Sequence, residues 1–474
     1  MKFNKHHNEN LQRKHLIIIF LFTLISFSAF GQFERSLFYL PILPNARTVN
    51  PAIIPSYKLY VGIPFISSVK TSFDNNFNHE DIFKKEGDSL YLDRDYILSN
   101  IDDETKGNIN LMDEVFTVGF RLKKNYFHFR IAEMMNMNFS IGKELFKFAL
   151  YGNGSDYYLG NTITFDKNTI NLTYYREYSA GYSREVTNKL NLGINVKYLQ
   201  GIANIYTNNL EASLYTDPDD FTLSAQTNIR INTSIPWQEG SGFQPGDVFT
   251  VTGNSGFAVD LGGWYTLSDK WTFAASILDL GKINWNNNLK NFKTKDPNKV
   301  VSFSGFDLGD FLEDGELDRD RINDVLDSLS NELGIVEAKE SYSTAIPTTM
   351  ILNANYYLGT DNQFSGVFGL QFLEDWSWPT FSLGYTRYFT KNVNMMLSYT
   401  ITPNSFFNLG GGFAANLGPA QFYLIAENFM APFALSKAEL FQIRFGINLV
   451  FGKAWKKEKT KKKGEEKPVD ENKG

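Results

Sequence analysis

The sequence contains no cysteine among its 474 residues, and histidine is nearly as scarce. The lack of cysteine excludes disulfide bridges and thiolate metal sites. Three of the five histidines lie in the first fifteen residues, and neither His79 nor His128 belongs to a two-histidine zinc pattern. The chain also has no G-x-S-x-G elbow and no Walker-type glycine loop. We therefore predict that the protein is not an enzyme and needs no cofactor or metal.

Charge of either sign is limited as well. Charged residues make up 21% of the chain, and the net charge of −6 gives a pI near 5.6. A general nucleic-acid-binding protein would show a basic face, so no nucleic-acid partner is expected. The 24 Tyr and 42 Phe within a 43% hydrophobic chain argue against disorder and exceed the aromatic content usual in a cytosolic enzyme.

Long apolar runs are missing after the N-terminus. Residues 1–31 have a basic start, the apolar stretch Leu16 to Ile25 and a small-residue end, which predicts a signal peptide cut after Gly31; the alternative is an uncleaved anchor helix. After residue 32 no run of about 18 apolar residues remains, so no other helix is expected to cross a membrane.

Instead, the chain alternates apolar and polar residues in segments of eight to twelve. One such run extends from Leu190 to Tyr198, and fifteen segments between residues 114 and 451 fit the pattern, among them 190–202, 204–215 and 221–233. Lipid on one face and water on the other requires this pattern, and a β chain can cross a membrane only as a closed barrel. A soluble sandwich also alternates, but the number, length and aromatic ends of the runs favour a transmembrane antiparallel β-barrel. Since bacterial barrels prefer even strand numbers, we predict about 14 strands, with 12 to 16 as the range.

The mature chain divides into three parts. Residues 32–113 are irregular, rich in Pro and Asn at first and in charge later, with only 57–65 strand-like. Residues 114–452 form the predicted barrel, with a short helix at 141–151. The Lys-rich tail at 453–474 is expected to be a disordered periplasmic segment, or alternatively to dock onto a periplasmic or cell-envelope partner.

An acidic insertion at 285–343 interrupts the barrel pattern. We place it outside the cell, because barrels keep periplasmic turns short. Helical spacing at 318–333 predicts a helix. The segment fails as a twelve-residue calcium loop, since Leu312 and Arg321 stand where oxygen ligands are required; an irregular calcium site is the alternative to a solvated loop.

Three consecutive glycines interrupt a good strand pattern. Gly410, Gly411 and Gly412 predict a bulge or bend, and a kink here could open the wall toward lipid. The alternative is simple accommodation of a segment inside the barrel.

Two motifs resemble a known superfamily. The tripeptide Asn50-Pro51-Ala52 is similar to a motif near the start of long-chain fatty-acid transporter-like outer-membrane barrels. Residues 259–265 and 275–285 resemble the paired Asp-Leu-Gly hairpin of that superfamily, especially an uncharacterised Bacteroidota branch. The matching hairpin residues are Asp260, Gly262, Asp279 and Gly281.

This resemblance implies a fourteen-stranded barrel whose N-terminal segment folds into the lumen as a hatch carrying Asn50 to Ala52. A bare turn at Asn50-Pro51 is the alternative. The acidic insertion and the Lys-rich tail depart from the transporters and put a fatty-acid substrate in doubt.

The predicted function is an outer-membrane transporter or channel for hydrophobic or amphipathic small molecules in a Gram-negative bacterium. The alternative is a non-transporting structural or assembly component of a secretion or surface-attachment complex. The expected partners are outer-membrane lipid, a hydrophobic ligand and a protein bound through the tail.

Overall fold

The computed structural model describes residues 35–77, 79–86, 89–236, 252–303, 312–313, 316–317, 327–373, 377–403, 405–429 and 440–453. The predicted signal peptide lies outside these residues, as does the predicted tail apart from Lys453. In the described part of the chain, no helix is both long and apolar enough to cross a membrane.

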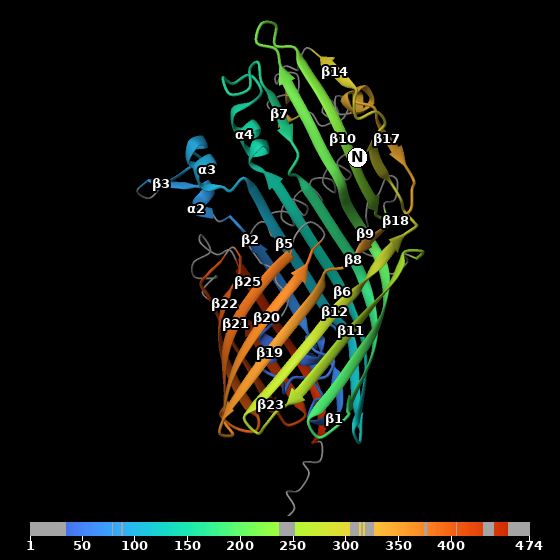
Figure 1. Ribbon diagram of the computed structural model, residues 1–474, viewed down its shortest axis with the longest axis vertical. Helices are drawn as coiled ribbons and strands as arrows, with labels where there is room; N and C mark the ends of the chain where they lie inside the picture. Colours follow the sequence, from blue (N-terminus) through green and yellow to red (C-terminus); the bar gives the residue numbers. More distant parts are fainter. Residues whose placement is uncertain are drawn as a thin grey trace, which may run out of the picture.

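Antiparallel strands close into a barrel with fourteen wall positions, which confirms the predicted fold (Figure 1). Two short strands, β1 (Tyr57–Gly62) and β2 (Val69–Asn75), share the first position and close the circle, since both pair with β5 and β25. The other wall strands are β5 (Glu104–Leu122), β6 (Asn125–Gly142), β8 (Thr169–Glu185), β9 (Leu190–Thr216), β11 (Ser255–Thr266), β12 (Trp271–Trp285), β19 (Thr348–Leu358), β20 (Asn362–Phe372), β21 (Ser377–Tyr388), β22 (Val393–Ile401), β23 (Asn408–Leu417), β24 (Ala420–Ala426) and β25 (Leu440–Lys453). A closed wall leaves no unpaired strand edge in lipid.

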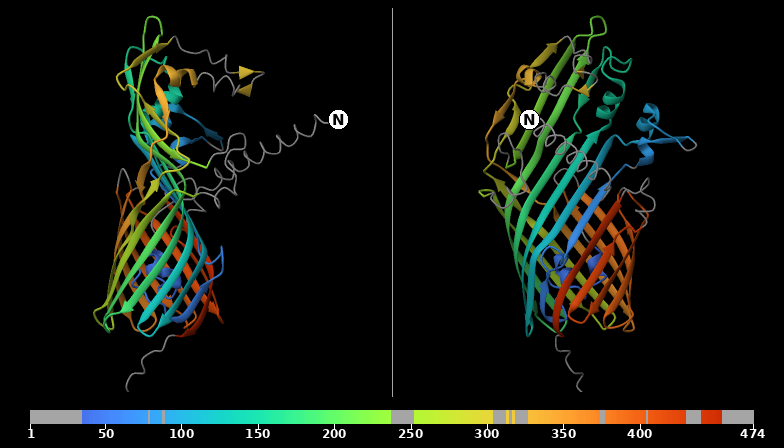
Figure 2. Two further views of the ribbon diagram at one scale, coloured as in Figure 1. Left: turned by 90° about the vertical axis from the view of Figure 1, so that its right-hand side faces the viewer. Right: turned by 180° about the vertical axis from the view of Figure 1, so that it is seen from behind.

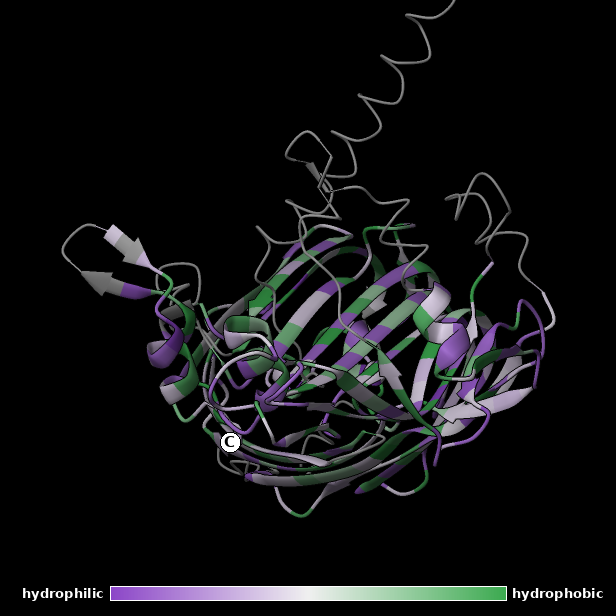
Figure 3. Cartoon of the chain, turned by 90° about the horizontal axis from the view of Figure 1, so that it is seen from above, coloured by the Kyte–Doolittle hydropathy of each residue, from purple (hydrophilic) through white to green (hydrophobic). Residues whose placement is uncertain are grey.

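The wall has the polarity that the alternating sequence predicts. Along β22, Met395 and Leu397 are 49% and 60% exposed on the outside. Asn394, Ser398 and Thr400 point inward and are buried. Seen from above, hydrophobic and hydrophilic residues alternate along the strands (Figure 3). An apolar outer face with a polar inner face is what lipid outside and a polar interior require.

A row of polar side chains interrupts the apolar outer face on one side of the barrel. The outward side chains of β9 from Leu192 to Tyr198 are apolar and exposed, and the next outward residue is Gln200. Cross-strand partners continue this row as Asp113, Glu133, Arg176, Gln200, Ser255 and Asn284. About ten residues of the tilted strand β9 separate Gln200 from the turn that precedes Leu190. This length corresponds to the roughly 25 Å height of the apolar band of a membrane barrel.

The strand assignment differs from the prediction in three places. The segments 190–202 and 204–215 are one strand, β9, and 221–233 corresponds to β10 (Leu223–Ser234), which lies above the barrel. The wall begins at Tyr57 rather than at 114, because β1 and β2 belong to it. β1 lies within the strand-like segment 57–65, but Pro64 interrupts that segment. β2 shows no clear alternation, because Val69 and Phe73 are its only apolar residues.

Above the barrel, β5, β6, β8 and β9 continue into a tall sheet (Figures 1 and 2). The upper part of β9 pairs with β10 on one side and β7 on the other. The remaining elements of this upper part are α2 (His79–Ile82), β3 (Lys84–Glu86), β4 (Ser89–Tyr91), α3 (Arg94–Asn100), α4 (Lys143–Tyr151), β7 (Thr162–Phe165), β13 (Asn291–Thr294), β14 (Val300–Phe303), β15 (Leu312–Glu313), β16 (Glu316–Leu317), β17 (Ile335–Ala338) and β18 (Tyr342–Ala345). The predicted helix at 141–151 corresponds to α4. Residues 327–332 are helical, and the rest of the helix predicted at 318–333 lies almost wholly outside the described residues.

The N-terminal segment at 35–56 lies inside the barrel, near the end opposite the tall sheet (Figure 2). Two short 3-10 helices, η1 (Ser36–Phe38) and η2 (Pro44–Thr48), form its core. Its apolar side chains, such as Phe38 and Leu43, are fully buried against inward-facing wall residues that include Ile351 and Val367. We call this segment the hatch.

Candidate functional site in the barrel lumen

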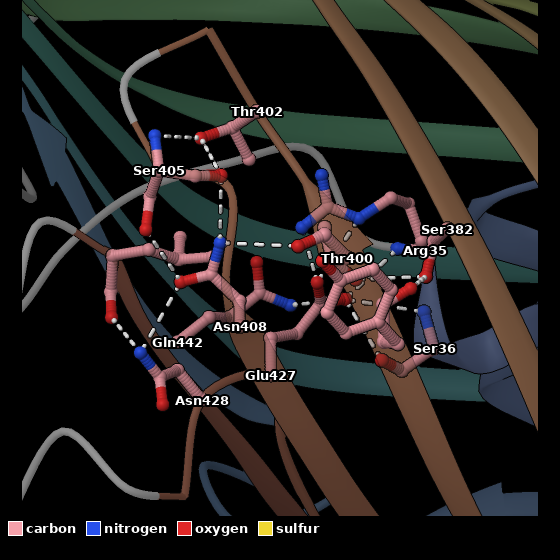
Figure 4. Close-up of polar contacts among 12 residues, drawn as sticks. Arg35, Ser36, Ser382, Thr400, Thr402, Ser405, Asn408, Glu427, Asn428 and Gln442 are labelled. Atoms are coloured by element: carbon pink, nitrogen blue, oxygen red, sulfur yellow. Dashed lines mark hydrogen bonds and ion pairs between the residues drawn. The ribbon is translucent and has the colours of Figure 1, made fainter.

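A buried ion pair fixes the start of the hatch to the wall. The Arg35 guanidinium pairs with the Glu427 carboxylate, which follows β24 (Figure 4). The same carboxylate accepts hydrogen bonds from the Ser36 amide at 3.2 Å and hydroxyl at 2.8 Å. Since both charged groups are fully buried, loss of either partner would leave an uncompensated charge.

Further polar contacts hold the hatch around the circumference of the barrel. Thr386 donates to the Tyr39 carbonyl at 2.7 Å, and Ser276 donates to the Val49 carbonyl at 2.7 Å. On the opposite side, the Arg47 guanidinium donates to the Pro51 carbonyl at 3.1 Å, to the Ile53 carbonyl at 2.9 Å and to the Ser183 hydroxyl. The hatch is therefore bonded to strands on several sides of the lumen, not only packed into it.

The predicted hatch motif lies directly against the predicted hairpin. The Asn50 amide donates to the carbonyls of Gly263 and Ala275 at 3.1 and 3.2 Å, and its oxygen accepts from the Ala52 amide at 2.8 Å. A Cβ added at Gly262 would come within 2.2 Å of the Asn50 side-chain oxygen. The structure thus brings Asn50, Pro51 and Ala52 together with Gly262, a contact that spacing in the sequence could not show.

Pro51 needs a second glycine for its place in the lumen. A Cβ added at Gly193 on β9 would come within 2.3 Å of the Pro51 carbonyl. No side chain larger than hydrogen fits at this inward-facing position while the hatch is in place.

The two aspartates of the hairpin converge on a lysine that the sequence analysis did not single out. Lys197 Nζ lies 2.8 Å from Asp260 and 2.6 Å from Asp279, with Glu177 at 3.6 Å. Asp260 also accepts hydrogen bonds from the Asp279 amide at 2.8 Å and from Asn195 at 2.9 Å. Lys197 lies on the polar face of a predicted strand, which was the only signal that could have identified it.

Gly281 completes the hairpin where β11 and β12 pack closely. A Cβ at Gly281 would lie 2.2 Å from the Phe257 carbonyl. Asp279 adopts a left-handed backbone with φ of +60°, at the point where the β11–β12 register shifts. This conformation is uncommon outside glycine and marks a bulge that turns the carboxylate toward Lys197.

A second set of charges joins this lysine cluster to the hatch. Arg130 lies 3.5 Å from Glu114 and 3.3 Å from Glu177, and Arg444 lies 3.7 Å from Glu114. The Glu114 carboxylate accepts hydrogen bonds from Asn45 of the hatch at 3.0 Å and from Ser67 at 2.8 Å. We call this group the luminal ion cluster; its members are Glu114, Arg130, Glu177, Lys197, Asp260, Asp279 and Arg444.

The irregularities of the wall coincide with the luminal ion cluster. Among described wall strands, register shifts occur at Glu114/Phe116, Tyr174/Tyr175 and Val259/Leu261. The interruption at 63–68 lies beside Glu114 and Arg444, and Ser68 accepts a hydrogen bond from Arg444 at 2.6 Å. Bulges bend a strand and re-aim its side chains, so these irregularities direct charge into the lumen.

The predicted kink at Gly410, Gly411 and Gly412 does not coincide with a register shift. β23 pairs in continuous register with β22 through all three glycines, and β24 pairs with it from Gly411. A Cβ at Gly410 would come within 2.3 Å of the Ser398 hydroxyl, so these positions allow close packing.

A cavity of about 100 Å³ lies directly above the hatch. Thr48 and Val49 of the hatch line it, together with members of the luminal ion cluster such as Arg130 and Lys197. Met112, Met134 and Leu278 add apolar surface. Charged and apolar groups therefore meet in one chamber, which suits an amphipathic molecule.

No group of His, Cys, Asp and Glu in the described residues is arranged to hold a metal ion. His128 points into the lumen, where its ring Nε2 lies 3.2 Å from the Thr117 hydroxyl. The segment considered as a calcium loop is mostly outside the described residues.

A family model described as a family of unknown function, DUF5723, matches residues 51–427. No curated protein matches the chain. Among solved structures, a Pseudomonas aeruginosa FadL homologue matches with a TM-score of 0.42 and 12% identity, covering 86% of this chain and 94% of that one. The Pseudomonas putida toluene transporter TodX matches at 0.39 and 10%, covering 86% and 92%. The translocator domain of the autotransporter NalP from Neisseria meningitidis matches at 0.30 and 9%, covering 83% and 88%.

Proposed function

Since the chain belongs to the DUF5723 family, whose function is unknown, we propose its function from the geometry of the lumen. The protein is an outer-membrane transporter for amphipathic or hydrophobic small molecules in a Gram-negative bacterium, exported by its signal peptide. One observation carries this proposal: a folded hatch closes the barrel beneath a chamber lined by both charged and apolar side chains. The proposal includes no enzymatic step.

A ligand would enter from the extracellular side, where the tall sheet stands, and bind above the hatch. Two exits from the chamber follow from the geometry. Local displacement of the hatch would open a path along the lumen. A path through the wall at the interruption at 63–68 would require its backbone hydrogen bonds to Glu114 and Ile447 to open. This interruption lies between Gly62 at the end of β1 and Val69 at the start of β2. Lys70 of β2 and Arg444 of β25 both line the chamber.

The experiment that tests this proposal removes the hatch but keeps the wall. A deletion of 35–56 ends before β1, whereas the full irregular segment at 32–113 includes β1, β2 and part of β5. We expect cells with the deletion variant to take up N-phenyl-1-naphthylamine faster than cells with the intact protein, and the purified variant to conduct ions in planar bilayers.

The control is an equal level of heat-modifiable, folded barrel in the outer membrane for both proteins. A folded variant with no gain in either permeability would contradict the transport proposal. That result would favour the alternative function.

The alternative is a structural or assembly component of a secretion or surface-attachment complex. A specific observation favours it: apolar side chains continue on the outer face of β5, β6 and β8 above the polar row. Leu111 and Ile170 there are 37% and 45% exposed. Such a surface is typical of protein contacts. Co-purification of a stoichiometric partner from cross-linked cells, lost on substitution of Leu111 by Ser, would support it.

A further inference from the structure

A second cavity, of about 260 Å³, opens above the first. The two cavities share Asn136 and Pro347 in their linings, so they are neighbouring chambers of one lumen. Their chemistry differs. The lower chamber is lined by several members of the luminal ion cluster, whereas no charged residue lines the upper one. We call the second cavity the amide chamber.

Asparagine side chains form two cross-strand rows beside this chamber. One row pairs Asn110 with Asn136, Asn136 with Thr173 and Thr173 with Asn204. The second row pairs Asn108 with Asn138, Asn138 with Asn171 and Asn171 with Tyr206. Since side chains at cross-strand positions lie close together on one face, the wall presents a band of amides to the lumen.

Most of these amides are engaged with the protein, and one is not. The Asn171 oxygen accepts from the Thr207 amide at 2.9 Å, and Asn204 donates to Leu172 at 2.7 Å and accepts from Tyr342 at 2.8 Å. The Asn136 amide nitrogen has no hydrogen-bond partner, although the residue is only 8% exposed. A buried donor without a partner is costly, and a ligand acceptor would remove that cost.

Aromatic rings complete the lining. Tyr206 and Phe372 line the chamber, and Tyr206 stacks on Tyr342 with ring centroids 6.4 Å apart. An amide offers both donors and an acceptor, which matches neighbouring hydroxyl groups, and an aromatic ring offers an apolar surface for the C–H face of a sugar. An anionic head group would find no cation in the lining of this chamber, and a hydrocarbon would leave the Asn136 amide nitrogen unpaired.

We infer that the amide chamber binds an uncharged, polyhydroxylated group of the saccharide type. This inference rests on the proposed transport function and names the head group of the amphiphile. The apolar part of the ligand then extends toward the lower chamber, where Met112, Met134 and Leu278 lie.

The test compares two ligands with the same six-carbon tail, hexyl β-D-glucoside and hexanoate. The full mature protein is placed in lipid nanodiscs, because sugar-based detergents would compete for the site. Binding is titrated by saturation-transfer difference NMR against empty nanodiscs. We expect saturable binding of the glucoside to the protein and weaker binding of hexanoate, since a site built for hydroxyl groups rejects a head that lacks them.

Asn136→Ala removes the unpaired amide, and we expect it to weaken glucoside binding by about threefold to tenfold. Asn136→Ser, which keeps a hydroxyl donor, should restore part of the affinity. Asn228→Ala is the matched control, because Asn228 lies on β10 outside the chamber and bonds to Glu211. Heat-modifiable mobility on gels and the unfolding temperature confirm that each variant is folded.

Three results would overturn the inference: no glucoside binding, binding equal to that of hexanoate, or binding that Asn136→Ala leaves unchanged. In each of these cases, uptake of N-phenyl-1-naphthylamine by the hatch-deleted protein still decides the proposed function separately. If uptake fails and glucoside binding depends on Asn136, the site is confirmed and the transport function is wrong.

Discussion

The lower barrel and the sheet above it share strands β5, β6, β8 and β9, yet their inward faces differ in chemistry. Below, the inward face carries buried charges that bind one another and the hatch. Above, the inward face of the same strands carries uncharged amides. Backbone pairing is continuous through both regions apart from single-residue shifts. The hydrogen-bonded strands therefore set the architecture, while the residues on their inward face set what the interior can bind.

The two regions also differ in how they are held. The lower region is a closed wall tied to a hatch by hydrogen bonds between residues far apart in the sequence. The upper sheet is open, and ion pairs near its edges, such as Lys290 with Glu337, are exposed. Since buried networks resist opening more than exposed ones, substitutions below should have the larger effects.

The largest effect is expected from Lys197→Met. This change leaves the buried carboxylates of Asp260 and Glu177, and the partly buried one of Asp279, without their shared cation. We expect a loss of about 3–5 kcal/mol in the free energy of unfolding. Urea unfolding of the barrel in detergent micelles, followed by tryptophan fluorescence, measures it.

Lys290→Met is the matched control, because Lys290 is 57% exposed in the upper sheet and should change stability by at most about 1 kcal/mol. Equal effects of the two substitutions would show that the lower and upper regions are not energetically different.

The second largest effect is expected from Arg35→Met, which should destabilise the seating of the hatch rather than the wall. It leaves the Glu427 carboxylate buried and unpaired, at a cost of about 3 kcal/mol that favours an open hatch. We expect brief conductance events in planar bilayers that the intact protein lacks.

The double variant Arg35→Met, Glu427→Met removes both charges and should recover much of the closed state. Conductance events that persist unchanged in the double variant would mean that hatch seating does not depend on this charge pair.

A smaller effect is expected from Gly193→Ala. The new methyl group would meet the Pro51 carbonyl, so the hatch must shift, at a cost of about 1–3 kcal/mol. Gly366→Ala is the control, since its Cβ would meet only the Leu383 side chain at an ordinary 3.8 Å. Protection of 35–56 from a protease in detergent measures the shift, and equal protection in both variants would argue against tight seating at Gly193.

The wall could be predicted from sequence because alternation is a local signal. The other thirteen wall strands repeat it within themselves. β1 and β2 do not continue it as one strand, because the six-residue interruption at 63–68, which contains Pro64, separates them. Gly201, midway in β9, lies at a register shift between β8 and β9. The shift interrupts the alternation, so the sequence predicted two strands where the structure has one.

The candidate site was predictable only in part. Asn50 and the hairpin aspartates were identified by resemblance, and the structure shows what they contact. The lysine that pairs with these aspartates was not predictable, because Lys197 and Asp279 are 82 residues apart. The ion pair of the hatch was not predictable either, because Arg35 and Glu427 are 392 residues apart. Pairing between residues so far apart in the sequence depends on the closed barrel, and the spacing of neighbouring residues in the sequence does not indicate it.

The smallest expected effect concerns acid in the upper sheet. A hydrogen bond from Lys293 lowers the pKa of the Glu340 carboxyl below its ordinary 4.5, with help from the nearby charges of Lys293 and Arg230. A lowered pKa means that the contact stabilises the sheet above pH 4.5 and is lost as the pH falls through the lowered value. Hydrogen exchange at β13 should therefore quicken in acid, beyond the intrinsic change, in the wild type but not in Glu340→Gln. High salt should abolish the difference, because the pair is exposed. An equal acid response in both proteins would show that this contact does not stabilise the upper sheet.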